Sequence, residues 1–501
     1  TWKKSVHSIT ATGVLSAQKY QYDRLYGASK DLSFNSLWYN LNGGAIESLS
    51  SNFSQWTMMS YVGRINYGLM DRYLLTASLR YDGSSRLSEG NKWALFPSAA
   101  IAWRITEEDF AKNLDWLSNL KLRFSYGQAG NTNSVSPYAS EGTISGSVYY
   151  PFGTSTSVGN LPANIANPML TWERTSEYNV GLDFGFLNQR ISGNIEYYNR
   201  TTNDLLMKRN IPVHLGYSSV TSNVGSVRNS GFELQLNTAN IMTKNFAWNT
   251  TINLAYNKNE IVSLADEEDL SNYSIHLQGM RGRYSDKRFI GKPVDTNWTQ
   301  NTIGVWQLGE EEEAAKYGCV PGNFKIKDYN NDGKLTDDDY IIDGKRTPDW
   351  TGGMTNMFKI YDFDFSFHMY FQAGATQYDR FFENFALEWN SQNFNNLRTN
   401  YWTPENPSNT MGRPSQMGSR GNIAYERTDF LKVSYITLGY TLNKRLMSKW
   451  GLDNARIYVT VQNPFILTKF RGLDPEQPDL TNIGDTDGMT MNALLGVNIS
   501  F

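Results

Sequence analysis

Residues 59–81, MSYVGRINYGLMDRYLLTASLRY, contain two runs in which apolar and polar side chains alternate one by one. In the first run Tyr61 and Ile65 fall on one face, while Arg64 and Asn66 fall on the other. A period of two is typical of a β-strand whose two faces meet different surroundings. Only a short turn separates the runs, so the stretch predicts two antiparallel strands with one apolar and one polar face.

The same alternation recurs along the whole chain. We count about 14 such segments, each of about 8 to 12 residues. They begin near His7, Trp56, Tyr73, Trp93, Leu120, Ser176, Arg190, Ser230, Phe246, Trp350, Asp362, Leu431, Ala455 and Met491. No run of apolar residues is long enough for a transmembrane helix, whereas the strands of a membrane barrel need only this weaker alternating signal.

The links between these segments are short and long in turn. Residues 70–72 and 187–189 are examples of the short links, while residues 257–349 and 374–430 are long. Outer-membrane barrels join their strands by short periplasmic turns and long extracellular loops. The sequence therefore predicts an all-β chain that forms a transmembrane antiparallel β-barrel, with residues 257–349 as one long extracellular loop. A soluble β-sandwich is the alternative, and it would need a second sheet to cover every apolar face.

The last predicted strand ends the chain on an aromatic residue. Leu495, Val497 and Ile499 share a face with Phe501. Such an ending resembles the C-terminal signal that the bacterial barrel-assembly machinery reads, so Phe501 is the candidate assembly signal. The alternative is an ordinary edge strand that happens to finish on phenylalanine.

Composition and motifs argue against several functions. The net charge of -3 leaves no basic footprint for nucleic acid. The single cysteine, Cys319, excludes an intrachain disulfide and a cysteine-based zinc site. The four histidines are widely spaced, and His368 falls on the polar face of its strand, where we expect it to line the lumen. Because no convergent acid/base pair or catalytic triad is visible, we expect no enzyme.

A possible calcium loop lies in the longest link. Residues 328–339 read DYNNDGKLTDDD, which resembles a twelve-residue calcium loop except that Asp replaces the usual Glu at position 12. We expect Ca²⁺ as a structural ion, and the alternative is an Asx-rich turn that bonds only its own backbone. The candidate ligands are the side chains of Asp328, Asn330, Asp332 and Asp339 and the carbonyl of Lys334.

Several stretches support a more specific interpretation when they are taken together. They are LKLRFSYGQAGN at 120–131, LTWERT at 170–175, YWTPENP at 401–407 and LDPE at 473–476. In sequence and in order they resemble the SusC/RagA-like TonB-dependent outer-membrane transporters of Bacteroidetes, and the resemblance covers nearly the whole chain.

The resemblance implies a plugged barrel of about 22 strands in the bacterial outer membrane. Residues 1–501 would supply its C-terminal 14 or so, with the plug domain and the N-terminal strands outside this chain. It further implies import of a glycan or peptide nutrient, a SusD-like lipoprotein that caps the barrel, and energy from TonB through the absent plug.

Four tryptophans in or near the expected loops could serve such a transporter. Trp389 and Trp402 are the candidates for contact with the substrate or the lid protein, because flat rings stack on sugars and anchor protein partners. Trp172 and Trp350 lie next to strand starts, where we expect them in the aromatic girdle. Packing within the loops is the alternative for each of them.

Two other functions stay open at this point. A passive outer-membrane porin would need neither plug nor lid, and its uptake would not depend on energy. A secreted adhesin or carbohydrate-binding β-protein would leave the membrane without detergent.

Overall fold

The computed structural model describes most of the chain. The described residues are 1–501 without 35, 37, 212–213, 215, 218, 388–398, 415–418, 444–446, 448–450 and 478–488. In this part of the chain, fifteen strands form one sheet in which hydrogen-bonded neighbours follow one another along the sequence. They are β1 (Trp2–Lys4), β2 (His7–Lys30), β3 (Ala45–Leu69), β4 (Tyr73–Ser84), β5 (Trp93–Arg104), β6 (Leu117–Asn131), β9 (Glu173–Phe186), β10 (Ile191–Asn203), β13 (Ser226–Met242), β14 (Phe246–Ser263), β22 (Trp350–Ile360), β23 (Phe363–Ala373), β26 (Phe430–Thr441), β27 (Asn454–Thr468) and β28 (Asn492–Ser500).

The predicted strands are all present. Each of the segments expected from the alternation is a strand of this sheet, and the all-β prediction is confirmed. The sequence does not predict β1, whose three residues are too few to show a period. β2 and β3 have 24 and 25 residues and are longer than predicted. At their loop ends both faces are exposed, so the alternation that predicts a strand is lost there. No helix among the described residues is long and apolar enough to cross a membrane.

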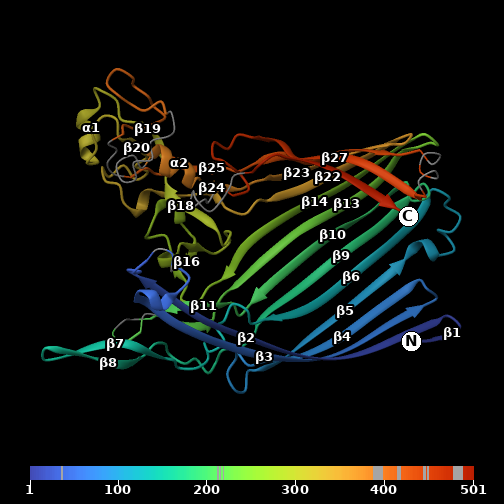
Figure 1. Ribbon diagram of the computed structural model, residues 1–501, viewed down its shortest axis with the longest axis horizontal. Coiled ribbons are helices and arrows are strands. Elements are labelled where there is room, and N and C mark those ends of the chain that lie inside the picture. The colour runs from blue at the N-terminus through green and yellow to red at the C-terminus, as the bar shows by residue number, and fades with distance from the viewer. Residues whose placement is uncertain are drawn as a thin grey trace. The chain divides into compact units, whose positions relative to one another are not determined.

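The chain divides into two compact units, and the first comprises residues 1–103, 124–178 and 200–226. It holds β1 to β5, two hairpins and a buried cluster beside them. The added elements are a 3-10 helix (Leu41–Gly43), β7 (Ile144–Phe152) with β8 (Ser155–Pro162), and β11 (Leu206–Asn210) with β12 (Ser219–Asn223). The buried cluster is Leu87, Ala94, Phe96, Val135, Leu170, Trp172 and Leu206. In Figure 1 the β7–β8 hairpin lies at the end of this unit away from the N-terminus.

The second unit comprises residues 104–123, 179–199 and 227–501. A 3-10 helix (Ile105–Glu107) begins it, and β14, β22, β23, β26, β27 and β28 pair antiparallel in unbroken succession. On β26 and β27 the opposite residues Leu438 and Val459 are exposed and apolar, whereas the next pair, Thr437 and Thr460, joins hydroxyls at 2.8 Å on the other face. One face is therefore suited to lipid and the other to water.

The described residues of the two longest links of the second unit fold into a body that we call the loop lobe, which comprises residues 264–349, 374–387, 399–414 and 419–429. Figure 1 shows its elements gathered at one end of the long strands, with the C-terminus at the other end. It contains β15 (Glu268–Asp269), β16 (Arg281–Arg283), β17 (Arg288–Phe289), β18 (Thr296–Gln300), β19 (Thr302–Val305), β20 (Phe324–Ile326), β21 (Tyr340–Lys345), β24 (Thr376–Tyr378), β25 (Tyr425–Arg427), α1 (Glu311–Lys316) and α2 (Arg380–Phe382). Short helical turns add Ile275–Leu277, Tyr284–Asp286, Asp337–Asp339 and Glu383–Leu387.

Short and long links alternate as predicted except around β5, where the link before it, residues 85–92, is shorter than the link after it, residues 105–116. Met70 and Asp71 close the β3–β4 turn with positive φ values of 55° and 54°, and Tyr361 at 53° begins the turn between β22 and β23. The long link after β14 begins at residue 264, so the predicted boundary at 257 is too early, because β14 continues to Ser263.

Candidate functional site

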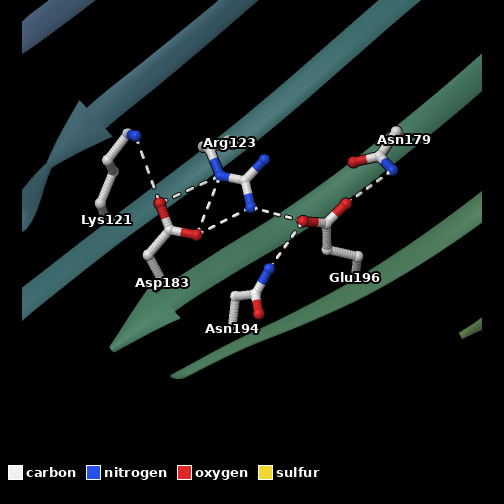
Figure 2. A network of polar contacts seen from close by, with 6 residues as sticks. All are labelled: Lys121, Arg123, Asn179, Asp183, Asn194 and Glu196. Carbon is white, nitrogen blue, oxygen red and sulfur yellow. Dashed lines mark hydrogen bonds and ion pairs between the residues drawn. The ribbon is translucent and has the colours of Figure 1, made fainter. Parts of the chain in front are cut away.

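The polar face of the second unit carries a charged network across three strands. Arg123 of β6 lies between Asp183 of β9 and Glu196 of β10 (Figure 2). Its Nη2 donates to Asp183 Oδ1 at 2.7 Å and to Glu196 Oε1 at 2.8 Å, while its Nε donates to both oxygens of Asp183 at 3.0 and 3.1 Å. The fork to Asp183 fixes the guanidinium against that carboxylate, and the remaining bond reaches Glu196.

Three further side chains complete the network (Figure 2). Lys121 Nζ pairs with Asp183 Oδ2 at 3.2 Å. Asn179 Nδ2 donates to Glu196 Oε2 at 3.1 Å, and Asn194 Nδ2 donates to Glu196 Oε1 at 2.9 Å. Two cations therefore meet two carboxylates, and the group is electrically balanced. The sequence does not predict this network; its residues share only a polar-face position in their strands.

A glycine makes room for the network. A Cβ at Gly181 would lie 2.9 Å from Arg123 Cζ, closer than side chains normally approach. Gly181 thus lets the guanidinium lie across β9 on its way to Glu196. The network favours a fixed geometry, because Arg123, Asp183 and Glu196 each have at least two partners, while Lys121 has Asp183.

A hollow of about 370 Å³ opens on the same face further along the second unit. Its polar lining is Asn194, Glu233, Gln235, Asn253, Thr351, His368 and Tyr370. Gly353 keeps it open, since a Cβ there would lie 3.0 Å from His368 Cε1. His368 is bonded through Nδ1 to Thr355 Oγ1 at 2.8 Å, so the predicted position of this histidine on the polar face is confirmed.

The candidate calcium loop forms a hydrogen-bonded turn. Asp328 accepts the N–H of Asn331 at 2.6 Å and that of Gly333 at 3.0 Å, and Asp332 accepts the N–H of Lys334 at 2.8 Å. Asp339 accepts two backbone N–H groups, from Tyr329 at 2.8 Å and Thr336 at 2.9 Å, and Asn330 accepts from Asp332 at 3.1 Å. These bonds are the ones expected of the alternative to a calcium site, an Asx-rich turn that bonds its own backbone.

The predicted ligands do not form a ready cation site in this arrangement. Within the described part of the chain, no three or more His, Cys, Asp or Glu side chains are grouped so that they could hold a metal ion. Burial raises the pKa of Asp328, but its bonds from Gly333, Tyr317 and Asn331 outweigh this and hold it below the ordinary value. The loop is thus stabilised by its own backbone, and calcium stays a prediction.

The predicted ligand-contact tryptophans lie in different situations. Trp389 lies outside the described residues. Trp402 is 6% exposed, packs with Val305 and Phe324, and donates from Nε1 to Gln307 Oε1 at 3.0 Å. A ring enclosed in this way has no face left for a ligand, which argues against the predicted direct contact; in this structure Trp402 supports the lobe from within.

The two predicted girdle tryptophans also differ. Trp172 is fully buried and donates from Nε1 to Lys92 O at 3.0 Å, so its assignment to the girdle is wrong. Its partners come from a distant part of the chain, which no local pattern reveals. Trp350 packs its ring 5.3 Å from Phe232 and 4.9 Å from Tyr256, as a residue of the apolar face would.

The loop lobe contains one buried acid that the sequence does not predict. Asp379 is fully buried, and its Oδ1 accepts the N–H of Phe382 at 2.9 Å, while its Oδ2 has no partner among the described residues. Burial raises the pKa of this carboxyl to about 6; the Phe382 bond and Arg471 lower it, and Glu426 raises it. A lone Asp in a loop gives no sequence signal for such burial.

Comparison with known proteins identifies the family. A family model described as TonB dependent receptor-like, beta-barrel matches residues 5–351. This chain belongs to the TonB-dependent receptor β-barrel family. A TonB-dependent receptor of Formosa agariphila is 33% identical over 518 residues, covering 99% of this chain and 51% of that receptor. SusC of Bacteroides thetaiotaomicron is 35% identical over 457 residues, covering 89% of this chain and 44% of SusC.

A solved structure supports the same fold. The RagAB peptide transporter superimposes with a TM-score of 0.80 at 24% identity, covering 99% of this chain and 54% of that one. This TonB-dependent receptor barrel thus spans about half the length of the relatives it matches.

Membership of this family confirms three predictions. The chain has the predicted β-barrel fold class, it is an outer-membrane protein, and its matched relatives are receptors rather than enzymes. Phe501 follows β28 and is 88% exposed. Its role as an assembly signal stays a prediction.

The charged network generates a stability prediction. We expect Arg123→Gln to lower the free energy of unfolding of this barrel by about 1–2 kcal/mol, because Asp183 and Glu196 lose their shared cation on a partly hydrated face. Chemical unfolding of the purified protein in detergent measures it. The control is Arg200→Gln, which breaks a more exposed pair with Glu177 and should cost less than about 1 kcal/mol. Equal losses in the two variants would contradict the assignment.

The calcium prediction can be tested without unfolding the barrel. We expect millimolar Ca²⁺ to slow proteolysis within residues 328–339, and EGTA to restore it, because an ion would tie down the exposed turn. Thermal unfolding of the barrel should not change. Asp332→Asn keeps an acceptor for the Lys334 N–H but removes one charge, so it should weaken the Ca²⁺ effect. Identical cleavage in Ca²⁺ and EGTA would leave only the hydrogen-bonded turn.

Asp379 makes the loop lobe sensitive to pH. Its folded pKa of about 6 exceeds the ordinary value of 3.8, so its contribution to stability is full below pH 3.8 and is lost as pH rises to about 6. We expect Asp379→Asn to keep the bond from Phe382 and to stabilise the lobe above pH 6 by about 1–2 kcal/mol. Limited proteolysis between pH 4.5 and 7.5 measures it. Glu405→Gln, an exposed acid of the same lobe, is the control, and an unchanged pH profile in Asp379→Asn would refute the account.

Proposed function

We propose that this chain is the C-terminal barrel portion of a TonB-dependent importer that carries a glycan or peptide nutrient across the outer membrane. The observation that supports it most is the division between the two faces of the second unit. The outward face is apolar, while the other face carries the Arg123 network and the hollow beside His368. A wall with a hydrated, fixed-charge inner face is suited to enclose a plug or a passing solute.

The edges of the sheet support the proposal that more strands complete the barrel. Among the described residues, β28 is hydrogen-bonded to β27 alone, and most of β2 is bonded to β3 alone. An unpaired strand edge in lipid costs several kcal/mol for each unsatisfied backbone group. The relatives are about twice as long as this chain, so an N-terminal portion of the same transporter is the proposed source of both the missing strands and the plug.

The loop lobe is the proposed place of first capture. It lies at the end of the strands where the long links are, which is the extracellular end in barrels of this kind. A SusD-like lipoprotein would close over this end, and TonB would act on the plug from the other. SusC and the RagAB peptide transporter are matched relatives, and they support a lid-bearing importer while leaving glycan and peptide both open. Contact of Trp389 with ligand or lid belongs to the same proposal.

The experiment is to extract the protein from native outer membranes in mild detergent and weigh every chain of the complex by intact-mass spectrometry. We expect residues 1–501 to be covalently continuous with a plug-bearing segment and to co-purify with a surface lipoprotein. In parallel, uptake of a labelled nutrient mixture should fall to the level of a deletion strain when TonB is removed.

The alternatives give different results in the same experiment. A lone barrel whose uptake does not respond to the loss of TonB would be a passive porin. Release from membranes by salt or urea, without detergent, would indicate a secreted binding protein and would exclude both transport functions.

A further inference from the structure

The loop lobe contains a pocket of about 500 Å³, a size common among small-molecule sites. Its walls come from the turn before β17, from β18, from the residue after β21, and from β24, α2 and β25. The lining residues are Lys287, Thr296, Asn297, Trp298, Arg346, Gln377, Tyr378, Arg380 and Tyr425. None of these is acidic, and three of them are cations.

Two of the cations carry the argument. Arg346 is exposed; its backbone N–H is bonded to Asp295 O at 3.3 Å, and its guanidinium forms no ion pair with a described residue. Lys287 lies with its Nζ 3.2 Å from the centre of the Tyr284 ring. Burial lowers the pKa of Lys287, and Asp337 opposes this, so its ammonium is partly desolvated and partly compensated by that acid. Two cations beside one cavity repel each other unless an anion lies between them.

Two of the acids near the pocket are engaged by neutral donors, while Asp337 acts on Lys287 and Asp286 pairs with Arg283. Tyr378 donates its hydroxyl to Glu383 Oε1, and Asn422 donates from Nδ2 to Asp343 Oδ2 at 2.8 Å. These two carboxylates thus have neutral partners. The pocket lining itself has no acid, so a ligand carboxylate would add to the compensation of Arg346 and Lys287.

The rest of the lining favours a sugar as the carrier of that charge. Thr296, Asn297 and Gln377 provide neutral hydrogen-bonding groups, and Trp298, Tyr378 and Tyr425 provide partly exposed rings. Hydroxyls and the flat face of a pyranose match these two features. One common way to hold a peptide is through main-chain bonds along a strand edge, and no such pairing is needed for the charged, amide and aromatic residues of this lining.

We propose that this pocket binds an acidic sugar, with the carboxylate of a uronic acid residue between Arg346 and Lys287. Arg346 forms the bidentate contact, because its planar fork matches a carboxylate. Lys287 supplies the second charge, and the aromatic rings carry the sugar face. The inference rests on the proposed import function, since it assigns the class of ligand that the loop lobe captures first.

The test uses the whole transporter in detergent and isothermal titration calorimetry. The probes are tetrasaccharides of glucuronic, galacturonic and mannuronic acid, each paired with its carboxyl-reduced form, and a tetrapeptide with a free C-terminal carboxylate. We expect at least one acidic tetrasaccharide to bind about tenfold more tightly than its reduced form. Arg346→Gln should remove that tenfold preference, and Arg346→Lys should restore part of it.

The control variant is Lys316→Gln, which removes an exposed cation of the lobe outside the pocket and should keep the preference. Equal thermal unfolding of Arg346→Gln and the unmodified protein ensures that loss of binding is not loss of fold. The inference is overturned if no acidic tetrasaccharide binds saturably, if the reduced forms bind equally well, or if Arg346→Gln keeps the preference. It is also overturned if only the tetrapeptide binds through Arg346. If the acidic sugars do not bind but uptake still depends on TonB, only the inference about this pocket is rejected. If uptake does not depend on TonB, the proposed function is rejected.

Discussion

The structure depends on the requirement that backbone N–H and C=O groups have partners in a medium without water. Lipid supplies none, so a spanning chain must satisfy every group through its own ladder. Such a sheet also has one face that requires apolar side chains and one that accepts polar side chains, and successive side chains alternate between the two faces. Leu438 and Val459 on one face, and Thr437 with Thr460 on the other, are one register step apart. The alternation, the long strands and the polar inner face follow from this single constraint.

The same constraint explains what could be predicted from the sequence. The strands of the main sheet other than β1 could be predicted because lipid on one side imposes a period of two on each of them. The short strands of the loop lobe were not, because β18 and β24 are held by partners elsewhere in the lobe and carry no period of their own. Trp172 was misplaced for a similar reason, since its buried position depends on Phe96 and Lys92, some 80 residues earlier in the chain. Sequence spacing shows which face a residue takes, but not which distant residue it meets.

The loop lobe has its own cores, and this matters for binding. Trp402, Phe324 and Val305 form one of them, and Leu277 and Phe289 belong to another. Gly322 fits beneath Trp402 with a positive φ of 87°, where a Cβ would lie 2.4 Å from the ring. Side chains on such a packed body are ordered before a ligand arrives, so binding loses less conformational entropy. The long links therefore provide a preformed surface at the mouth of the barrel.

The inner-face network and the cations of the lobe pocket differ in how far their charges are compensated by neighbouring acids. In the inner-face network, Arg123 and Lys121 are balanced by Asp183 and Glu196, and the amides of Asn179 and Asn194 bind the carboxylate of Glu196. Such a closed group attracts no ligand, and its effect is to hold three strands in register. In the pocket of the lobe, two neighbouring carboxylates are held by neutral donors, Asp337 acts on Lys287, and the lining itself contains no acid. Cations beside one cavity repel each other. A carboxylate of the proposed ligand would relieve that repulsion.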